Sequence, residues 1–354
     1  MKLDQNWFLE TISGGRNGLL PSAPRFLLFL ISLVYRLVIA ARNWAYDMGW
    51  KKSFQAKMPV ISIGNLTTGG TGKTPMVIWL AKRLGQDHDV TVISRGYGSK
   101  DGNLNDEGLE IESSCPGVKL IQNPNRVAAA NEVDRKADSV IVLDDGFQHR
   151  RLHRDLDIVL IDASNPFGHD FVLPRGLLRE PVEQVRRSDL VVLTRSNLIE
   201  RPARDAIRQR LQQCHPALNW AEAELKLMGW RDAKDIVHPL STLDEQSLFA
   251  FSAIGNPDGF IETLRRLDVG IVGKKRFNDH HSFTPADLEL IQRNAAEHSA
   301  DAIVCTMKDF VKVRSIQIDG LPVYALATEL EIGVGLELID QLLNQTLSEL
   351  KDSR

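Results

Sequence analysis

A glycine-rich turn between an apolar run and a helical pattern is the strongest constraint in this sequence. Residues 61–75 read ISIGNLTTGGTGKTP, and Val60 to Ile63 has the β-branched, apolar character of a buried strand. After the turn, Met76 to Leu84 spaces its apolar residues three and four positions apart, as a helix does. A strand, a glycine-rich turn and a helix in this order are typical of a loop that binds phosphate groups.

Within this loop, each residue type has a chemical role. Backbone N–H groups would converge on a polyphosphate, Lys73 would reach the β- and γ-phosphates, and Thr74 would offer its hydroxyl to Mg²⁺. The residues expected to bind the nucleotide are Thr67, Thr68, Gly69, Gly70, Thr71, Gly72, Lys73 and Thr74. The strict motif has glycine where Thr67 stands, so a turn that merely joins a strand to a helix is the alternative.

Composition limits the class of protein. The 354 residues are 43% hydrophobic and 25% charged, which suits an ordinary folded chain of two domains. The three cysteines form no CxxC pair, so neither a zinc cluster nor a disulfide framework is expected, and a reducing compartment fits. A net charge of -3 argues against a globally basic nucleic-acid binder. No obligate protein partner is evident.

The N-terminal segment is basic and apolar. Residues 1–57 carry a net charge of +5. Within them Phe26 to Ala41, FLLFLISLVYRLVIAA, would form a helix only ~24 Å long, short of the ~30 Å hydrocarbon core. Its few polar residues fall on one stripe, and Trp44 and Trp50 follow it. We expect a helix lying in a membrane surface, with a full span or a buried packing helix as alternatives.

Beyond the loop the chain alternates strand-like and helix-like runs, which is typical of a parallel sheet covered by helices. The expected fold is α/β: a P-loop NTPase-like, mostly parallel sheet flanked by helices, with a second, smaller α/β domain and an N-terminal membrane-associated helix. The expected domains are a membrane-surface helix region at 1–50, a core with the phosphate loop at 51–224, a smaller α/β domain at 225–328, and a C-terminal helix at 329–354 that could pack back on the core.

Two adjacent carboxylates end a second apolar strand. In VIVLDDGFQH, residues 140–149, Asp144 and Asp145 follow four apolar residues. A strand-ending Asp beside a phosphate loop is the Walker B arrangement, which fixes Mg²⁺ directly or through water. Adjacent strand residues point to opposite faces, so the two carboxylates are expected to differ in role. The alternative is a polar turn after a core strand.

Several longer motifs occur together with the loop and in a fixed order. They are GNLTTGGTGKTP at 64–75, SRGYGSK at 94–100, DDGFQHRRLHRD at 144–155, LPRGLLREP at 173–181 and DHHSF at 279–283. In this combination the chain resembles the tetraacyldisaccharide 4′-kinase family of lipid A synthesis over roughly residues 55–310.

This resemblance implies an enzyme that uses ATP and Mg²⁺. It would transfer the γ-phosphoryl group to the 4′-hydroxyl of a tetraacylated glucosamine disaccharide 1-phosphate, giving a lipid A precursor. The partners implied are this acylated disaccharide lipid and the lipids of the inner-membrane surface. The implied location is the cytoplasmic face of a bacterial inner membrane, as a monotopic or peripheral protein.

The resemblance also implies residue roles. The catalytic residues are Asp106, His280, Lys73 and Asp145, with Asp106 as the base and His280 as its partner, the adjacent His281 being the alternative. The metal-region residues are Thr74, Asp144, Asp145 and Glu180, and those on the substrate side are Glu107, Gln148, His149 and Arg175. Where the family has Gly-Asp-Glu-Pro, this chain has Asn105-Asp106-Glu107-Gly108, and Thr-Glu-Lys-Asp appears as Thr306-Met307-Lys308-Asp309.

Two other functions fit parts of the sequence. A dimeric nucleotide switch of the deviant Walker type shares the core of the loop, although its signature lysine would fall at Thr68. A membrane-docked nucleotide-binding scaffold without transfer activity is the third reading.

Overall fold

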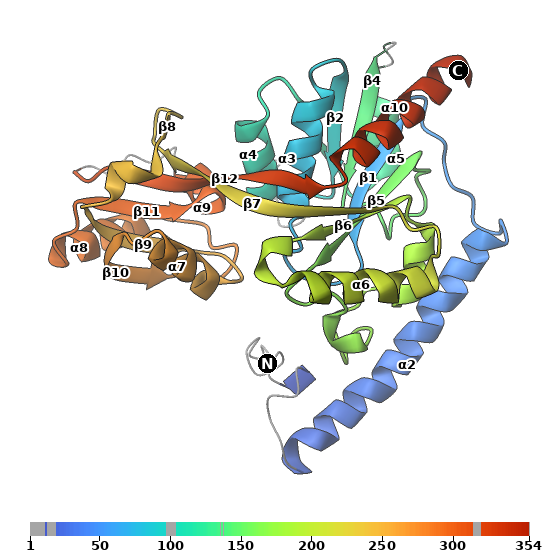
Figure 1. Cartoon of the computed structure of the whole chain (residues 1–354), viewed down its shortest axis with the longest axis horizontal. Helices are drawn as coiled ribbons and strands as arrows, with labels where there is room; N and C mark the ends of the chain where they lie inside the picture. Colours follow the sequence, from blue (N-terminus) through green and yellow to red (C-terminus); the bar gives the residue numbers. More distant parts are fainter. Residues whose placement is uncertain are drawn as a thin grey trace. The chain divides into compact units, whose positions relative to one another are not determined.

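The chain contains two compact units of unequal size. The computed structural model describes residues 11–12, 19–96, 104–134, 136, 138–313 and 320–353. Unit 1 comprises Met1–Arg95, Val118–Glu224 and Ile332–Arg354, and unit 2 comprises Gly96–Gly117 and Leu225–Glu331. Figure 1 labels the elements of both.

Unit 1 is built on a parallel sheet. Its strands lie in the order β3-β2-β4-β1-β5-β6-β7, and every neighbouring pair is parallel. These strands are β1 (Val60–Asn65), β2 (Asp89–Ser94), β3 (Lys119–Gln122), β4 (Ser139–Asp144), β5 (Leu156–Asp162), β6 (Leu190–Thr194) and β7 (Trp220–Arg231). The helices are α2 (Leu19–Asp47), α3 (Lys73–Leu84), α5 (Arg126–Glu132), α6 (Arg201–Cys214) and α10 (Leu336–Ser353), with short 3-10 turns at Gly168–Asp170, Val182–Arg187 and Ser196–Leu198.

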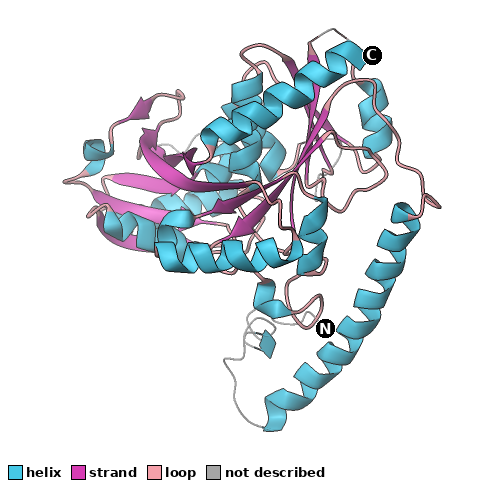
Figure 2. Ribbon diagram, turned by 45° about the vertical axis from the view of Figure 1, so that its right-hand side comes forward, coloured by secondary structure: helices cyan, strands magenta, loops and turns pink. Residues whose placement is uncertain are grey.

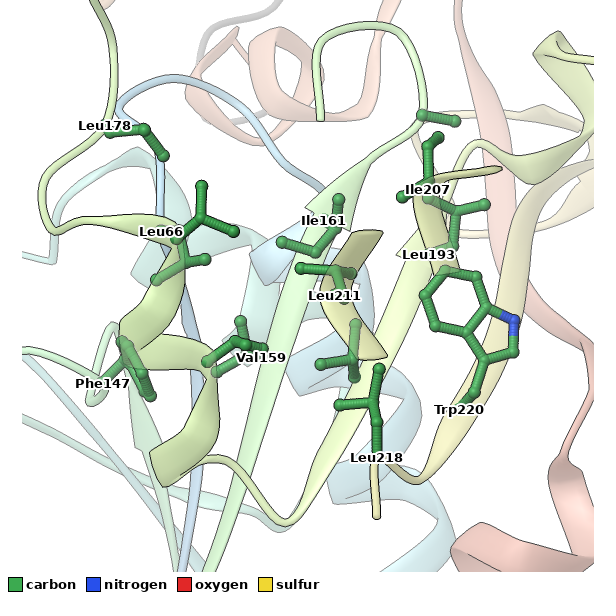
Figure 3. Close-up of a cluster of buried hydrophobic side chains, with 14 of the residues drawn as sticks. Leu66, Phe147, Val159, Ile161, Leu178, Leu193, Ile207, Leu211, Leu218 and Trp220 are labelled. Carbon is green, nitrogen blue, oxygen red and sulfur yellow. The ribbon is translucent and has the colours of Figure 1, made fainter. Parts of the chain in front are cut away.

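Burial on both faces explains why the central strands are continuous apolar runs. Every residue of β1, β4, β5 and β6 is buried. On one face Val159 and Ile161 of β5 pack with Ile207 and Leu211 of α6 (Figure 3). The alternate strand residues point to the opposite face. Helices therefore flank the sheet (Figure 2), and the expected α/β fold with a mostly parallel sheet is confirmed.

The order of the strands places two motifs side by side. β1 lies between β4 and β5, and Ile63 of β1 is in register with Asp144 of β4. The glycine-rich loop follows the carboxyl end of β1, and the acidic pair stands at the carboxyl end of β4. In sheets of this kind ligands bind outside the carboxyl ends of the strands, where the strand order reverses.

Unit 2 has its own parallel strands, in the order β10-β9-β11-β12. They are β9 (Ser247–Ser252), β10 (Gly270–Arg276), β11 (Ala302–Thr306) and β12 (Val323–Val334), and the short β8 (Val237–His238) pairs antiparallel with β7. Its helices are α4 (Asp106–Ser114), α7 (Pro257–Arg266), α8 (Pro285–Glu297) and α9 (Met307–Val313), with a 3-10 turn at Leu240–Leu243. Two hydrophobic clusters form its core. One contains Phe249, Phe251 and Ile291, and the other contains Leu248 and Leu264.

The division into units differs from the expected domains in one segment. Gly96–Gly117 belongs to unit 2, whereas the sequence analysis assigned all of 51–224 to the core. The reason is that α4 packs against α9, which lies far along the chain. Unit 2 then resumes at Leu225, and the C-terminal helix α10 is part of unit 1, where Asp340 pairs with Arg83 of α3.

The N-terminal helix α2 is longer than the apolar run that predicted it. Its 29 residues correspond to about 44 Å, and the part from Ala23 to Asp47 is, among the described helices, the one long and apolar enough to cross a membrane. The helix turns its polar stripe toward unit 1, because Ser32 and Asn43 are buried. Its exposed large hydrophobic residues are Phe26, Leu27, Leu30, Ile31, Leu33, Val34, Leu37, Val38 and Trp44.

Candidate functional site

The phosphate loop has the backbone geometry that its glycines predict. β1 ends at Asn65 and α3 begins at Lys73, so residues 66–72 form the loop. Gly69 and Gly72 have φ angles of +109° and +85°, a region that side chains with a Cβ rarely adopt. Among the described residues, no acceptor is within hydrogen-bonding distance of the Gly69, Gly70 and Gly72 N–H groups. These N–H groups and the N-terminus of α3 are suited to bind an anion.

Side chains from three segments hold the loop in shape. The Asn65 amide donates to the Thr67 carbonyl at 2.8 Å and to the Thr71 hydroxyl at 2.9 Å. The Thr194 hydroxyl, at the end of β6, donates to the Thr71 carbonyl at 2.9 Å. The Thr68 N–H donates to the Leu177 carbonyl at 2.7 Å, so it is not available to a phosphate, contrary to the expectation for Thr68. Thr67, Thr68 and Thr71 therefore support the loop.

Lys73 and Asp145 lie together at the start of α3. Lys73 Nζ is 3.8 Å from Asp145 Oδ1, and the Arg179 guanidinium donates to both carboxylate oxygens at 2.6 and 3.0 Å. Burial raises the pKa of Asp145, but the bond from Arg179 and the charges of Lys73 and Arg126 outweigh it and hold that pKa below its usual value. Asp145 is thus an anion that two cations hold beside the loop.

Arg179 is a site residue whose pairing with Asp145 the sequence did not indicate. Its backbone N–H donates to the Leu66 carbonyl at 2.7 Å, so the segment that carries it runs beside the phosphate loop. The Arg179 side chain also donates to Asn65 Oδ1 at 3.3 Å. The only signal in the sequence was an arginine within LPRGLLREP, which gave no indication of its partner.

Asp144 and Asp145 differ in environment, as the strand geometry predicts. Asp144 is the last residue of β4 and is buried, whereas Asp145 has left the strand with a φ of +52°. Within the described ranges, no three His, Cys, Asp or Glu side chains are grouped as metal ligands. Mg²⁺ needs only one or two carboxylates when phosphate oxygens supply other ligands. The Asp144 carboxylate and the Thr74 hydroxyl are hard oxygen donors that fit this requirement.

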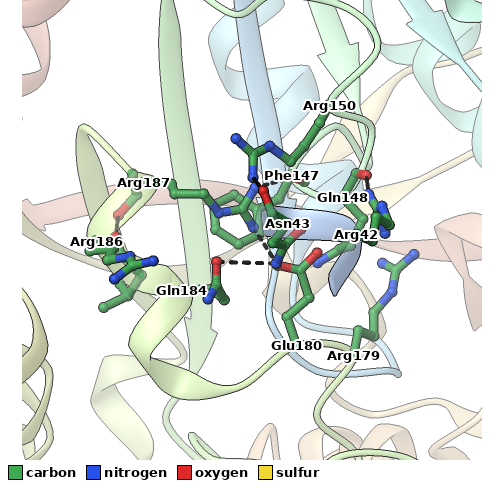
Figure 4. Close-up of polar contacts among 12 residues, drawn as sticks. Arg42, Asn43, Phe147, Gln148, Arg150, Arg179, Glu180, Gln184, Arg186 and Arg187 are labelled. Carbon is green, nitrogen blue, oxygen red and sulfur yellow. Dashed lines mark hydrogen bonds and ion pairs between the residues drawn. The ribbon is translucent and has the colours of Figure 1, made fainter. Parts of the chain in front are cut away.

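Glu180 does not join the acidic pair. It is completely buried, and its carboxylate accepts a hydrogen bond from Arg187 and one of 3.3 Å from Asn43 of α2 (Figure 4). Asn43 also donates to Gln184 at 3.2 Å, and the Tyr35 hydroxyl of α2 donates to the Arg179 carbonyl at 2.9 Å. Glu180 therefore connects α2 to Arg187 within unit 1, and its expected role in the metal region stays a prediction.

Three residues expected on the substrate side belong to unit 1. The Gln148 amide donates to the Asn65 carbonyl at 2.8 Å, so this side chain braces the start of the loop. Arg175 donates to the Ile12 carbonyl at 2.9 Å and lies over the Phe171 ring. His149 is surrounded by cations: burial, then Arg126, Arg151, Arg154 and Arg42, lower its pKa to about 4, so its imidazole is neutral at pH 7.

The Asp106–His280 pair expected from the resemblance is present within unit 2. His280 Nδ1 is 3.2 Å from Asp106 Oδ2, and because an ionised carboxylate only accepts, Nδ1 donates this bond. Asp106 is the first residue of α4, where the Asn105 side chain caps the helix by accepting from the Gly108 N–H at 2.9 Å. The altered Asn-Asp-Glu-Gly segment thus still forms a capped helix start that presents Asp106.

His281 has a different position from His280. His281 Nε2 is 3.1 Å from Asp287 Oδ2, and its ring stacks on Phe277 with centroids 4.9 Å apart. His280 is exposed and has a φ of +58°, a strained conformation that often occurs at functional sites. Glu107 is adjacent to Asp106 in the first turn of α4. Tyr97 to Lys100 of the SRGYGSK motif lie outside the described residues.

Comparison with known proteins identifies the family. Residues 24–348 match the family model LpxK, described as tetraacyldisaccharide-1-P 4′-kinase. A tetraacyldisaccharide 4′-kinase from Halothermothrix orenii is 32% identical, over 96% of this chain and 97% of that protein. One from Geobacter sulfurreducens is 38% identical, over 86% and 88%.

A solved structure agrees with this family. The crystal structure of LpxK from Aquifex aeolicus in complex with ATP matches with a TM-score of 0.73 and 28% identity, over 91% of this chain and 99% of that one. Because the family model spans most of the chain, and relatives above 30% identity do so as well, this chain belongs to the tetraacyldisaccharide-1-P 4′-kinase family.

Proposed function

We propose that this protein transfers the γ-phosphoryl group of ATP to the 4′-hydroxyl of a tetraacylated glucosamine disaccharide 1-phosphate. The observation that carries the proposal is the phosphate loop with Lys73 and Asp145 in a chain of this kinase family. ATP is the nucleotide bound by the Aquifex aeolicus relative, and the loop here has N–H groups, of Gly69, Gly70 and Gly72, without an acceptor among the described residues, as binding a triphosphate requires.

In unit 1, the chain's own groups would neutralise the phosphates. Lys73 extends from the first residue of α3, where the positive end of the helix dipole also favours an anion. Thr74 and Asp144 would hold Mg²⁺, which offsets charge on the phosphate oxygens when bound. Asp145 keeps Lys73 and Arg179 beside the loop until the triphosphate arrives. Positioning and charge neutralisation account for most of the rate in phosphoryl transfer.

In unit 2, Asp106 would act as the general base. The 4′-hydroxyl gives its proton to Asp106 while its oxygen bonds to the γ-phosphorus, and the bond from that phosphorus to the bridging oxygen of ADP breaks. His280 donates to Asp106 Oδ2 and so orients the carboxylate. A base placed in this way contributes roughly 10²- to 10⁴-fold to the rate.

The proposed location is the cytoplasmic face of the bacterial inner membrane, with α2 lying in the surface. The N-terminal apolar helix is consistent with membrane association. The contacts of α2 favour a helix that lies in the membrane surface over one that spans the membrane. The Phe29 ring packs on Phe171, Tyr35 donates to the Arg179 carbonyl and Asn43 donates to Glu180. A helix crossing the bilayer with these contacts intact would carry charged surface of unit 1 into hydrocarbon. Trp44 and Trp50, which are exposed and in mutual contact, suit the headgroup level.

A transfer assay with γ-labelled ATP, Mg²⁺ and the acylated disaccharide in mixed micelles tests the function. A kinase places the label on the lipid. A nucleotide switch would release it as free phosphate at a rate independent of the lipid, and a scaffold would leave it on ATP. Either of these two results would contradict the proposal. Lys73→Met is the matched negative control, since it removes the charge at the phosphates and keeps the length of the side chain.

A further inference from the structure

We infer that Lys312 is a positioning residue for the general base, an inference that rests on the proposed role of Asp106. Lys312 lies in α9, and its side chain is only 7% exposed. Its ammonium is 3.3 Å from Asp106 Oδ2, 3.2 Å from Asp309 Oδ1 and 3.2 Å from the His281 carbonyl. The ammonium thus donates hydrogen bonds to Asp106 and to the His281 carbonyl and forms an ion pair with Asp309.

The two bonds to Asp106 converge on the same oxygen. His280 Nδ1 and Lys312 Nζ both contact Oδ2, and Oδ1 has no hydrogen-bond partner in the part of the chain that the structure describes. A carboxylate fixed through one oxygen by two donors presents its other oxygen in a defined direction. Oδ1 is therefore the atom that would accept the hydroxyl proton, and Lys312 helps to aim it.

Lys312 is itself held firmly, which a positioning residue requires. Asp309 is completely buried, and its Oδ2 accepts from the Ala253 N–H at 3.0 Å and from the Thr306 hydroxyl at 2.8 Å. The Lys312 ammonium also lies 5.3 Å from the centre of the Phe283 ring. The chain of contacts from Ala253 through Asp309 and Lys312 thus ties the base to the core of unit 2.

His280 alone would orient the base less well. Its side chain is 56% exposed, whereas that of Lys312 is almost enclosed. His280 Nε2 is also 3.5 Å from Lys308 Nζ, and Lys308 pairs with Asp279 at 3.2 Å. An exposed imidazole loses more freedom on being fixed than an enclosed ammonium does. Lys312 is therefore the enclosed donor to Asp106, and His280 is the exposed one.

Several charged groups surround Asp106, and any effect of pH includes all of them. They are His280 and Asp279 from the loop before α8, Lys308, Asp309 and Lys312 from α9, and Glu107 and Glu110 from its own helix. Lys312 is the cation among them that contacts the carboxylate directly. Removing it takes away a positive charge and a hydrogen-bond donor in direct contact with the base.

The test compares Lys312→Met and Lys312→Gln with wild type in the full-length protein. We expect kcat for lipid phosphorylation to fall roughly 10- to 100-fold in both, a part of what a general base supplies. KM for ATP should stay within about twofold, since the nucleotide groups belong to unit 1. Lys226→Met is the matched control, because Lys226 is an exposed lysine of unit 2 paired with Glu331.

A double variant, Lys312→Gln with Asp106→Asn, distinguishes a positioning role of Lys312 from a role in packing. If Lys312 acts through Asp106, adding Lys312→Gln to Asp106→Asn causes little further loss. Unchanged kcat in a folded variant would overturn the inference. An additive loss in the double variant, or failure of both single variants to fold, would assign Lys312 a purely structural role and also overturn it. Full activity in Asp106→Asn alone would instead refute the proposed base.

Discussion

Asp145 illustrates how residue-scale geometry determines the chemistry of the phosphate loop. Its φ of +52° turns the carboxylate away from the strand direction of Asp144, toward Lys73 and Arg179. Two neighbouring residues of the same type thereby acquire different roles, one buried at the strand end and one paired with cations. The strand-end Asp was predictable from the sequence. The pairing with Arg179 was not, because it depends on residues 34 positions apart meeting beside Leu66.

The first residue-scale prediction concerns Lys73. Lys73→Met removes a charged contact to the phosphates, so we expect ATP to bind roughly 10- to 100-fold more weakly, the usual range for a hydrogen bond to a charged group. Phosphoryl transfer should fall further, because charge accumulates on the phosphoryl oxygens in the transition state. Calorimetry with Mg·ATP checks the affinity. Equal affinity of Lys73→Met and wild type for Mg·ATP would contradict the proposed role of the loop in nucleotide binding.

The second residue-scale prediction concerns pH and His149. Its pKa of about 4 in the folded protein is lower than the value near 6.5 of an unfolded chain, so the unfolded state binds the proton more readily. Its contribution to stability is fully present above pH 6.5 and is lost as pH falls toward 4. His149→Gln should therefore lose less stability than wild type between pH 7 and pH 5 in thermal unfolding. An identical pH dependence of Tm in wild type and His149→Gln would contradict the contribution of the lowered His149 pKa to stability.

At the scale of elements, α2 presents opposite faces to protein and solvent. The polar stripe recognised in the sequence is the face that docks on unit 1, through Asn43 and Tyr35, so the apolar face is left exposed. Amphipathicity was predictable from the sequence. Which face the protein covers was not, because that depends on Glu180 and Arg187, more than a hundred residues away.

The element-scale prediction replaces exposed apolar residues of α2 with charge. Val34 and Leu37 have 62% and 69% of their surfaces exposed, so Val34→Glu and Leu37→Glu should not disturb packing. Each should weaken binding to anionic vesicles by roughly tenfold or more, given the energy of burying such a side chain. Leu198→Glu, a matched change at an exposed residue of unit 1 outside α2, should bind as wild type does. Vesicle sedimentation distinguishes these outcomes.

Substitution is a sharper test of α2 than deletion. Removing the helix would take Asn43 away from the completely buried Glu180 and disturb a buried ion pair with Arg187. A buried charge that loses a partner is strongly destabilising, so a deletion would confuse membrane release with unfolding. If Val34→Glu and Leu37→Glu bind vesicles as tightly as wild type does, the exposed face of α2 is not the membrane contact.

At the scale of the whole molecule, buried strands were easier to predict from the sequence than the division of the chain into two units. The apolar runs at β1 and β4 were evident because both faces of these strands are covered. β7, WAEAELKLMGWR, was missed because Glu222, Glu224 and Lys226 interrupt its apolar residues. Gly96–Gly117 was assigned to the wrong unit because only its contacts with α9 reveal where it packs.

The same division separates two tasks of the proposed reaction. Lys73, Thr74, Asp144 and Asp145 belong to unit 1, whereas Asp106, His280 and Lys312 belong to unit 2. Nucleotide binding and activation of the hydroxyl should therefore respond to different substitutions. This separability is the central claim of the mechanism.

The most direct test measures ATP affinity and lipid phosphorylation side by side in wild type and Asp106→Asn. The account predicts that Asp106→Asn binds Mg·ATP within about twofold of wild type while kcat falls roughly 10²- to 10⁴-fold, the contribution of a general base. A parallel loss of ATP affinity and turnover, or full turnover without the carboxylate, would contradict it.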